Sequence, residues 1–595
     1  MSPSSTADLI DNGPVPTIQK PKWIQASKTY EVPKTTLNDP ANRPLRVITI
    51  GGGVSGIMMA YKIDQGMKNV EHLRCPVSRI HIPLGAYPDW KAFLATSKDI
   101  LTYLQSVVDK LDLAKYINLN HQVAGCWWDE EKGKWRVKVQ IVEPKADWSS
   151  VEPLKVLSEF WDEADMIMHA TGILNRWDYP DIPGLKDFKG RLVHTAGWPD
   201  DFGAEAWNNQ DVVVIGSGSS SIQVVPTMQP HVKHMDVYVR TPVWFVQIMN
   251  NFGNNHKYTE KEQQFYRDNP KLLVAHIKEL ENEANGRFDQ NIMGSAEQAA
   301  WRKMVEERMR SIIKDEKILQ GLLPDFPVNC RRMTPGDPYL QAIQEPNVDL
   351  RFTGVARITE DGVVGDDGVE RKCDVIVCAT GFDVSYRPRF PVVGRGGVNL
   401  QDKWKDAAEA YFGLACADMP NWLTFIGPNW PIAVGSITGG LDANGDYAIQ
   451  CLKKLQNEQI KSFCPKQDAS DQYNEHTQTW APLVVWGKGC RTWYKDNDTD
   501  RLSGVYAGST VHYIEMISNV RWEDMDLDYL NKQNKYAFMG IGRHMCQTEE
   551  GRAAGMSSST YYRPDRIDPR ILDVTKGMSS GNYSKEGETN KSPTV

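Results

Sequence analysis

The chain contains 595 residues, of which 41% are hydrophobic and 24% charged, a composition typical of a globular protein with two or three domains. Its formal net charge of −8 and isoelectric point near 5.9 argue against a surface that binds nucleic acid or an anionic membrane. Residues 1–43 lack the hydrophobic core of a secretory signal, and no apolar run approaches the ~20 residues that span a bilayer, so we expect a cytoplasmic protein.

The ten cysteines have neither the CxxC spacing of a redox pair nor the spacing of metal ligands. In a cytoplasmic protein this pattern predicts reduced thiols and no metal site. It also argues against an NADPH-dependent disulfide reductase, because such an enzyme needs a reactive cysteine pair beside its flavin.

The first predicted element follows an N-terminal extension, residues 1–44. Residues 45–50 form a continuous apolar run that predicts a buried parallel strand, and residues 57–65 have helical periodicity. Between them, a glycine-rich turn would let backbone N–H groups at a helix N-terminus approach a pyrophosphate. Its glycines are Gly51, Gly53 and Gly56. The unit predicts a dinucleotide site.

A second unit repeats this pattern. Residues 211–215 predict a strand, residues 216–221 a turn of alternating glycine and serine, and residues 222–228 a helix. Ser221 stands at the position that Gly56 occupies in the first unit, and its side chain is small enough for close packing of helix on strand. Two such units predict two dinucleotide sites, one for a donor cofactor and one for an acceptor.

The strand after the second turn ends in Arg240 and Thr241. A site for NAD places an acidic residue at this point to bind the ribose hydroxyls, whereas a guanidinium suits the 2′-phosphate of NADP. Arg240 therefore favours NADPH. The alternative is an ordinary solvated arginine.

Residues 256–323 are charged and have helical patterning, which predicts a helical insertion in the second dinucleotide-binding domain. Two interpretations stay open: a lid over the active site, or a solvated helical pair without a gating role. Residues 374–378 again predict a buried strand. The tail, residues 546–595, is rich in Ser, Gly, Asn and charge, and we predict that it is disordered.

The segment 188–199 carries the most specific motif. It matches the pattern FxGxxxHxxxW[PD] at every specified position, with His194 and Trp198 at the two central ones. This pattern is the fingerprint of type I Baeyer–Villiger monooxygenases, and the chain from Leu45 to about Arg543 resembles that family. Monooxygenases that oxidise nitrogen or sulfur are similar but carry Tyr or Phe in place of Trp198. The segments 490–494, 508–513 and 521–524 resemble fungal members that serve polyketide or terpenoid pathways.

The resemblance implies an α/β fold with two Rossmann-like dinucleotide-binding domains, one for FAD and one for NADP. The FAD-binding domain would be split, with residues 45–180 as its first part and residues 346–545 as its return with the substrate-side region. The NADP-binding domain would comprise residues 181–345. Two Ala-Thr-Gly turns, 170–172 and 379–381, would link the domains.

The resemblance also implies the reaction and its residues. NADPH reduces FAD, reduced flavin captures dioxygen as a peroxyflavin, and this attacks a ketone to give an ester or lactone. Arg332 would stabilise the negative charge that develops, because arginine stays protonated; a solvated arginine pair is the alternative. His194 would couple domain motion to the state of the cofactor. The implied catalytic group is Arg332, His194 and Trp198, and the implied cofactor-binding group is Gly51, Gly53, Ser55, Gly56, Val123, Gly216, Ser217, Gly218, Ser219, Ser220, Ser221, Gln223, Arg240, Thr241 and Arg331.

The sequence departs from the family pattern after Cys75. About thirty residues are missing, roughly one dinucleotide-binding repeat, and residues 77–85 look foreign to the family. Glu71 lies at the start of its strand, where it is badly placed to bind a ribose. We attribute the departure to an error of reading frame or intron boundary. If the sequence is correct, a pseudoenzyme that binds NADP but not flavin is the alternative, besides a monooxygenase that oxidises nitrogen or sulfur.

The C-terminal half is rich in tryptophan, including Trp422, Trp430 and Trp493. These residues are consistent with a roomy pocket for a bulky, flat or polycyclic substrate, but core packing explains most of them. The sequence specifies neither the ketone nor the oligomeric state.

Overall fold

The computed structural model describes residues 30–75, 86–145, 149–247, 255–487, 489–562 and 567. The chain divides into two compact units, one of residues 40–535 and one that joins the two ends, residues 1–39 and 536–595. The unusual segment 77–85 lies outside the described residues. In the unit of the two ends, Met545–Gln547 (η9) and Glu549–Ala553 (α15) are helical, which corrects the prediction of disorder from residue 546.

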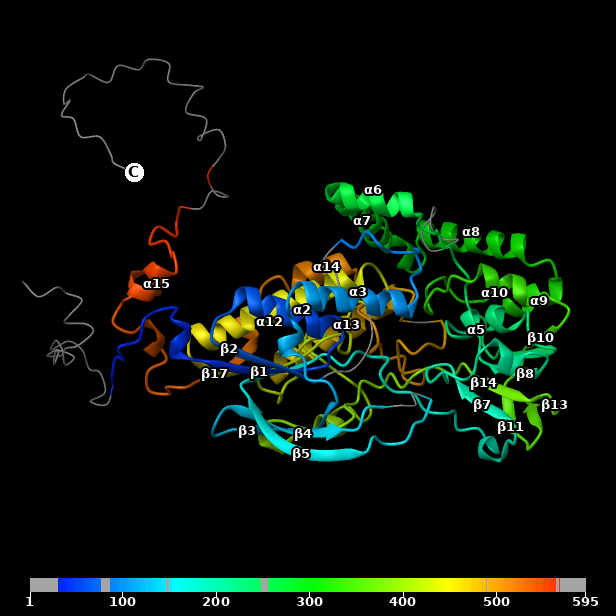
Figure 1. Ribbon diagram of the computed structural model, residues 1–595, viewed down its shortest axis with the longest axis horizontal. Coiled ribbons are helices and arrows are strands. Elements are labelled where there is room, and N and C mark those ends of the chain that lie inside the picture. Colours follow the sequence, from blue (N-terminus) through cyan, green and yellow to red (C-terminus); the bar gives the residue numbers. More distant parts are fainter. Residues whose placement is uncertain are drawn as a thin grey trace, which may run out of the picture. The chain divides into compact units, whose positions relative to one another are not determined.

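The first parallel sheet has the strand order β16-β6-β1-β2, and Figure 1 labels its strands β1 and β2. Its central strand β1 is almost wholly buried, which explains the continuous apolar run in the sequence. Helix α2 (Val54–Gly66) connects β1 to β2 and packs on α12 (Ile437–Asn457). The strands are β1 Leu45–Ile50, β2 Val70–Cys75, β6 Met166–His169 and β16 Trp422–Thr424.

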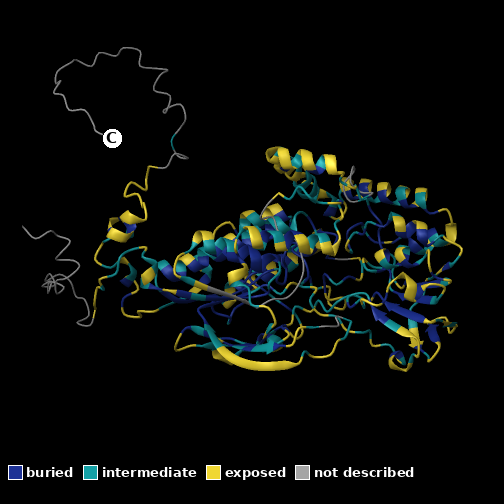
Figure 2. Ribbon diagram, viewed as in Figure 1, coloured by how far each residue is buried: buried dark blue, intermediate teal, exposed yellow. Residues whose placement is uncertain are grey.

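A second sheet, of order β15-β3-β4-β5, joins three strands from the first part of the chain to one strand that follows the second Ala-Thr-Gly turn. Its strands are β3 His121–Asp129, β4 Lys134–Val142, β5 Val156–Ala164 and β15 Val392–Val393. Figure 2 shows that the edge strand β5 is exposed along most of its length, unlike the parallel strands. Helix α3 (Ser97–Lys110) precedes this sheet and begins with a capping box at Thr96.

A five-stranded parallel sheet of order β10-β9-β8-β14-β7 forms the second dinucleotide-binding fold. It includes β10 and β14, so its strands reach Cys378. The predicted division at residue 346 is therefore wrong: Val375 pairs with Val212, and such a long-range pairing cannot be found from local sequence. The strands are β7 Arg191–His194, β8 Asp211–Ile215, β9 His234–Tyr238, β10 Val348–Arg351 and β14 Val375–Cys378. In the sequence, a small antiparallel sheet lies between β10 and β14, with strands β11 Val355–Ile358, β12 Gly362–Gly365 and β13 Glu370–Lys372.

The helical insertion is present. Its helices are α6 Glu260–Asp268, α7 Pro270–Asn285, α8 Ala296–Ile312 and α9 Glu316–Leu322. The remaining helices of this unit are α4 Ala204–Trp207, α5 Ser221–Met228, α10 Asp337–Ala342, α11 Leu400–Lys403, α13 Gln467–Trp480 and α14 Thr510–Met516, and β17 Ile460–Pro465 pairs with β18 Met525–Tyr529. Within the described ranges, every helix is too short or too polar to span a lipid bilayer.

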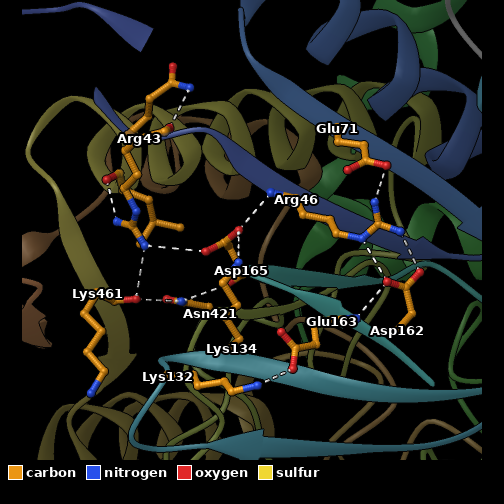
Figure 3. A network of polar contacts seen from close by, with 12 residues as sticks. Arg43, Arg46, Glu71, Lys132, Lys134, Asp162, Glu163, Asp165, Asn421 and Lys461 are labelled. Atoms are coloured by element: carbon orange, nitrogen blue, oxygen red, sulfur yellow. Dashed lines mark hydrogen bonds and ion pairs between the residues drawn. The ribbon is translucent and has the colours of Figure 1, made fainter. Parts of the chain in front are cut away.

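A buried polar network joins the start of β1 to the C-terminal strands (Figure 3). Arg43 is 6% exposed and donates to the carbonyl oxygen of Leu455 at 2.6 Å, while one of its nitrogens lies 3.9 Å from a carboxylate oxygen of Asp165. Asn421 donates to the backbone oxygens of Asp165 and Lys461. These contacts satisfy polar groups that would otherwise be buried without partners.

Cys330 and Cys490 form a disulfide, with their Cα atoms 6.3 Å apart. This corrects the prediction that all thiols are reduced; 160 residues separate the two, so their spacing carries no signal of the pairing. Trp422 and Trp430 are 1% and 0% exposed and belong to hydrophobic core clusters, so core packing, the explanation favoured for most of the tryptophans, holds for these two.

Candidate functional site

The first glycine turn lies at the carboxyl end of β1, directly against the first Ala-Thr-Gly turn. The amide of Ala170 donates to the carbonyl oxygen of Ile50 at 2.8 Å. Gly51 has φ +127°, and a Cβ added there would lie 2.2 Å from the carbonyl oxygen of Ala170. A Cβ at Gly56 would lie 2.0 Å from the oxygen of Gly51. The turn therefore has room only for glycine at these positions.

The second glycine turn repeats this arrangement at the end of β8. The amide of Ala379 donates to Ile215 at 2.9 Å, and a Cβ at Gly216 (φ +117°) would lie 2.5 Å from the oxygen of Ala379. Each glycine turn thus packs against the alanine of one Ala-Thr-Gly turn. Ser221 is fully buried at the first position of α5, so serine fits where the first unit needs glycine.

Two side chains at the second turn, those of Ser217 and Gln223, form hydrogen bonds to nearby backbone oxygens. The hydroxyl of Ser217 donates to the oxygen of Thr241 at 3.1 Å, and Gln223 donates to the oxygen of Ser219 at 2.8 Å. Ser220 is the N-cap of α5 but makes no side-chain cap. Likewise Gly53, the N-cap of α2, offers no side chain. Both helix N-termini therefore present backbone N–H groups to an anion.

Arg240 and Arg331 lie close together near the end of β9. Arg331 donates to the oxygen of Pro242 at 3.4 Å, which brings it next to Arg240. Burial lowers the pKa of Arg331, and the positive charge of Arg240 lowers it further. Arg332 follows in the chain and is exposed, and its charge acts on Tyr494. Two neighbouring positive charges attract an anion such as a phosphate.

The predicted catalytic residues His194 and Trp198 lie elsewhere. His194 is 0% exposed, and its ring stacks on Trp177 at 4.4 Å with an angle of 8°. Its Nδ1 accepts from the amide of Ala196 at 3.1 Å, so the neutral ring carries its hydrogen on Nε2 and donates it to Thr380 at 3.2 Å. Trp198 donates to the oxygen of Phe202 at 2.9 Å. His194 is buried and Trp198 is partly exposed, and the ring nitrogens of both are engaged by the protein.

Two further predicted cofactor-binding residues, Ser55 and Val123, are buried in the first domain. Ser55 is buried in the first turn of α2. Val123 is 5% exposed in β3 and packs in the same core cluster as Ile48 and Ile50 of β1, close to the carboxyl end of that strand.

Glu71 lies at the amino end of β2, opposite Arg46, and forms an ion pair with it (Figure 3). Arg46 also donates twice to Asp162, at 2.9 and 2.7 Å. The carboxyl end of β2 is Cys75, which pairs with Ile50. Glu71 is thus engaged at the wrong end of the strand to bind a ribose, as its position in the sequence predicted.

The helical insertion packs against the segment 89–94 of the first domain. Arg267 of α6 forms an ion pair with Asp89 at 2.6 Å, and the amide of Phe93 donates to the oxygen of His256 at 2.9 Å. A cavity of about 180 Å³ lies between the two. Its lining is mainly aromatic and aliphatic: Tyr87, Pro88, Trp90, Ala92, Phe93, Ala95, Tyr258, Tyr266, Leu273, His276, Ile277 and Leu280. The insertion therefore contacts the first domain around this cavity, and its role as a lid stays a prediction.

Sequence reasoning missed several residues of this site. Thr380 lies in a recognised turn, but nothing in the sequence indicated that it meets His194. Trp177 follows the first Ala-Thr-Gly turn without any motif. Cys330 directly precedes the arginine pair, and that adjacency is the one signal that could have identified it.

Comparison with known proteins is consistent with this geometry. The family described as FMO-like, flavin-binding monooxygenase-like, matches residues 81–403. The FAD-binding monooxygenase moxY of Dothistroma septosporum is 44% identical over 580 residues, which cover 93% of this chain and 90% of that protein. The FAD-binding monooxygenase stcW of Emericella nidulans is 44% identical over 589 residues, with coverages of 95% and 94%. A Baeyer-Villiger monooxygenase of Streptomyces coelicolor is 30% identical over 435 residues, which cover 72% of this chain and 78% of that protein.

Among solved structures, cyclohexanone monooxygenase from Rhodococcus sp. Phi1, determined with NADP+ bound, superposes with a TM-score of 0.67 and 22% identity. The match covers 82% of this chain and 100% of that chain. Oxidised steroid monooxygenase bound to NADP gives a TM-score of 0.66 at 21% identity, with coverages of 81% and 99%. At this identity the likeness shows the fold.

Proposed function

The chain belongs to the flavin-binding monooxygenase-like family, and from this premise we propose that it is a Baeyer–Villiger monooxygenase dependent on FAD, NADPH and dioxygen. Its substrate would be a small-molecule ketone, which it converts to an ester or lactone. A bulky ketone of a polyketide or terpenoid pathway is proposed from the resemblance of segments 490–494, 508–513 and 521–524 to fungal members of the family.

The residues at the two glycine turns fit two dinucleotides. In the first, the pyrophosphate of FAD would lie over the N-terminus of α2, close to Gly51 and Ser55, with Val123 beside the adenosine half. In the second, the pyrophosphate of NADP would lie over α5, close to Gly216 and Gly218. Gly51 and Gly216 support both assignments, since only glycine lets each turn pack this closely against the alanine of an Ala-Thr-Gly turn and end at the N-terminus of a helix.

The sheets support a revised division of the chain. The NADP-binding domain would run from about residue 181 to the turn at Ala379, because β10 and β14 complete its sheet. The FAD-binding domain would comprise residues 45–180 and the chain after that turn.

When bound, FAD supplies the activation of dioxygen with electrons from NADPH. The protein itself would supply fixed positive charge from three arginines. Arg240 and Arg331 would hold the 2′-phosphate, and Arg332 would stabilise negative charge that develops on the reacting oxygen atoms. His194 would act through Thr380 and Trp177 as a link between the domains, because its buried neutral ring cannot exchange protons with a substrate.

The observation that carries this proposal is the proximity of Arg240 and Arg331 near the carboxyl end of β9, with Arg332 next in the chain. Its test is the visible spectrum of the purified protein with FAD, before and after anaerobic NADPH. We expect a flavin band near ~450 nm that NADPH bleaches. Arg332→Ala should retain this reduction and lose oxygenation of a ketone, whereas Arg310→Ala, which removes an exposed arginine of α8, should change neither.

One observation favours a second candidate. Glu71 is bound to Arg46, so no described carboxylate of β2 can hold the ribose of FAD. A protein that binds NADP but not flavin would follow if no other residue fulfils this role. Failure to take up FAD at any concentration, with NADP+ binding retained, would establish that candidate and overturn the proposed oxygenation.

A further inference from the structure

The disulfide Cys330–Cys490 lies beside Arg331 and Arg332. Cys330 is fully buried and immediately precedes Arg331 and Arg332 in the chain. Four residues beyond Cys490 lies Tyr494, a fully buried residue. Burial raises the pKa of Tyr494 to about 12, and the nearby charge of Arg332 opposes this rise. The disulfide and the Arg332–Tyr494 approach thus join the same two segments.

The chain before Cys330 is held firmly to the NADP-binding side. Gln298 of α8 is buried and binds both backbone groups of Val328, donating to its oxygen at 3.2 Å and accepting from its amide at 3.3 Å. Asn329 donates to Asn291 at 2.7 Å. Trp244 donates to the oxygen of Phe326 at 2.9 Å. Residues 326–329 therefore have a fixed position.

The arginines themselves are held weakly. Arg331 reaches Pro242 at 3.4 Å, and the hydroxyl of Thr334 donates to the oxygen of Arg332 at 3.5 Å. Both distances are at the long limit for a hydrogen bond. Among the described contacts, the next shorter backbone hydrogen bond along the chain is at Thr334, whose carbonyl oxygen accepts from the amide of Val246 at 3.0 Å. The disulfide is consequently the strongest link next to the two arginines.

We propose that the Cys330–Cys490 disulfide is a positioning element for Arg331 and Arg332, and that its reduction to two thiols weakens NADPH binding. This inference rests on the proposed role of the arginines. A covalent link to the C-terminal segment limits the conformations of residues 330–333, so it lowers the entropy lost when the arginines close on a phosphate. The enzyme would thereby respond to the thiol redox state of its surroundings.

The reductant would be a dithiol. Cys490 is partly exposed and Cys330 is buried, so a thiolate of the reductant attacks the sulfur of Cys490 and the thiolate of Cys330 leaves. The second thiol of the reductant then displaces Cys490, and the reductant ends as a disulfide. Two electrons pass to the protein, and two protons convert its sulfurs to thiols.

The test compares the full-length protein purified without reductant with the same protein after dithiothreitol. Peptide mapping without reduction should recover a fragment that links Cys330 to Cys490. Titration calorimetry with NADP+ should give a dissociation constant about tenfold higher after reduction, the size expected for one weakened charge-assisted contact. Cys490→Ser should reproduce the reduced state and lose its response to dithiothreitol. Cys373→Ser, which removes a free thiol elsewhere, should behave as the parent protein.

A second readout separates positioning from general destabilisation. The ratio of kcat/KM for NADPH over NADH in flavin reduction should fall about tenfold on reduction, since only NADPH carries the 2′-phosphate. An equal loss for both cofactors, equal NADP+ affinity in the two redox states, or absence of the linked fragment would overturn the inference. If the protein takes up no flavin, the proposed oxygenation fails, yet the calorimetric comparison still decides the role of the disulfide.

Discussion

The imidazole of His194 lies parallel to the indole of Trp177, with 4.4 Å between the ring centroids. Trp177 belongs to the connection after the first Ala-Thr-Gly turn, and Thr380, which accepts from His194, belongs to the second such turn. One ring therefore contacts both connections between the dinucleotide-binding folds. This geometry explains how the most specific motif of the sequence can matter without its histidine touching a substrate.

Because His194 is buried, its pKa falls from 6.5 to about 4. The folded chain therefore binds this proton less readily than the unfolded chain, and the resulting stability is complete above pH 6.5 and is lost as the pH falls toward 4. We expect the free energy of unfolding to decrease by about 2 kcal/mol from this residue between pH 7.5 and pH 5. Urea denaturation at the two pH values measures it.

His194→Gln should remove the contribution of His194 to the pH dependence of the free energy of unfolding, while the glutamine amide still donates to Thr380. Part of the pH dependence should remain, because burial also lowers the pKa of His169 to about 4. His231→Gln, at an exposed position, should leave the pH profile of the parent unchanged. A profile for His194→Gln identical to that of the parent would show that His194 titrates normally in the folded state.

The two glycine turns can be tested one at a time. Gly51→Ala should abolish FAD uptake, and Gly216→Ala should abolish NADP+ binding with FAD retained, because each Cβ would meet an alanine carbonyl at 2.2 or 2.5 Å. Flavin absorbance and NADP+ calorimetry measure the two effects. Gly368→Ala is the matched control: it has φ +75° but no atom near its Cβ, so we expect a loss of stability of about 1–2 kcal/mol and normal binding. Equal damage to both cofactors by either variant would refute two separate sites.

Local sequence was sufficient for the units around β1 and β8. An apolar run followed by glycines and a helical period specifies strand, turn and helix within about twenty residues, and the structure forms them at the predicted positions. The helical insertion was likewise predictable from its periodicity. These elements depend on contacts between near neighbours in the chain.

Long-range contacts could not be predicted. The run at residues 374–378 indicated a buried strand, but only the pairing of Val375 with Val212 assigns it to the second sheet. The disulfide was missed for the same reason, as was the contact between Trp177 and His194. Trp422 and Trp430 fill the core, as expected of most tryptophans, although local sequence does not distinguish a large aromatic residue of the core from one that lines a pocket.

The polar network at the start of β1 supplies a test of stability away from the cofactors. Arg43→Leu should lower the free energy of unfolding by about 3 kcal/mol, because it leaves the buried carboxylate of Asp165 with fewer partners. Lys132→Ala breaks an exposed ion pair with Glu163 in the same region (Figure 3), and we expect no measurable loss of stability. Urea denaturation of both variants distinguishes them. Similar values for the two would mean that Arg43 is not effectively buried.

Arg240 offers a test in which stability and binding change in opposite directions. Its charge lies close enough to Arg331 to lower the pKa of that residue, so the two guanidinium groups repel each other in the absence of a phosphate. Arg240→Ala should therefore raise the free energy of unfolding without cofactor by a few tenths of a kcal/mol. The same variant should lower kcat/KM for NADPH roughly tenfold to hundredfold, the effect of one hydrogen bond to a charged group, and leave kcat/KM for NADH unchanged.

Arg310→Ala provides the matched control, since its ion pair with Glu306 lies on the surface of α8. Raising the salt concentration should reduce the advantage of NADPH in the parent protein more than in Arg240→Ala, because screening weakens an exposed charge contact. A variant that loses NADPH and NADH activity equally would place Arg240 outside the phosphate site, and the preference for NADPH would then have to come from Arg331 alone.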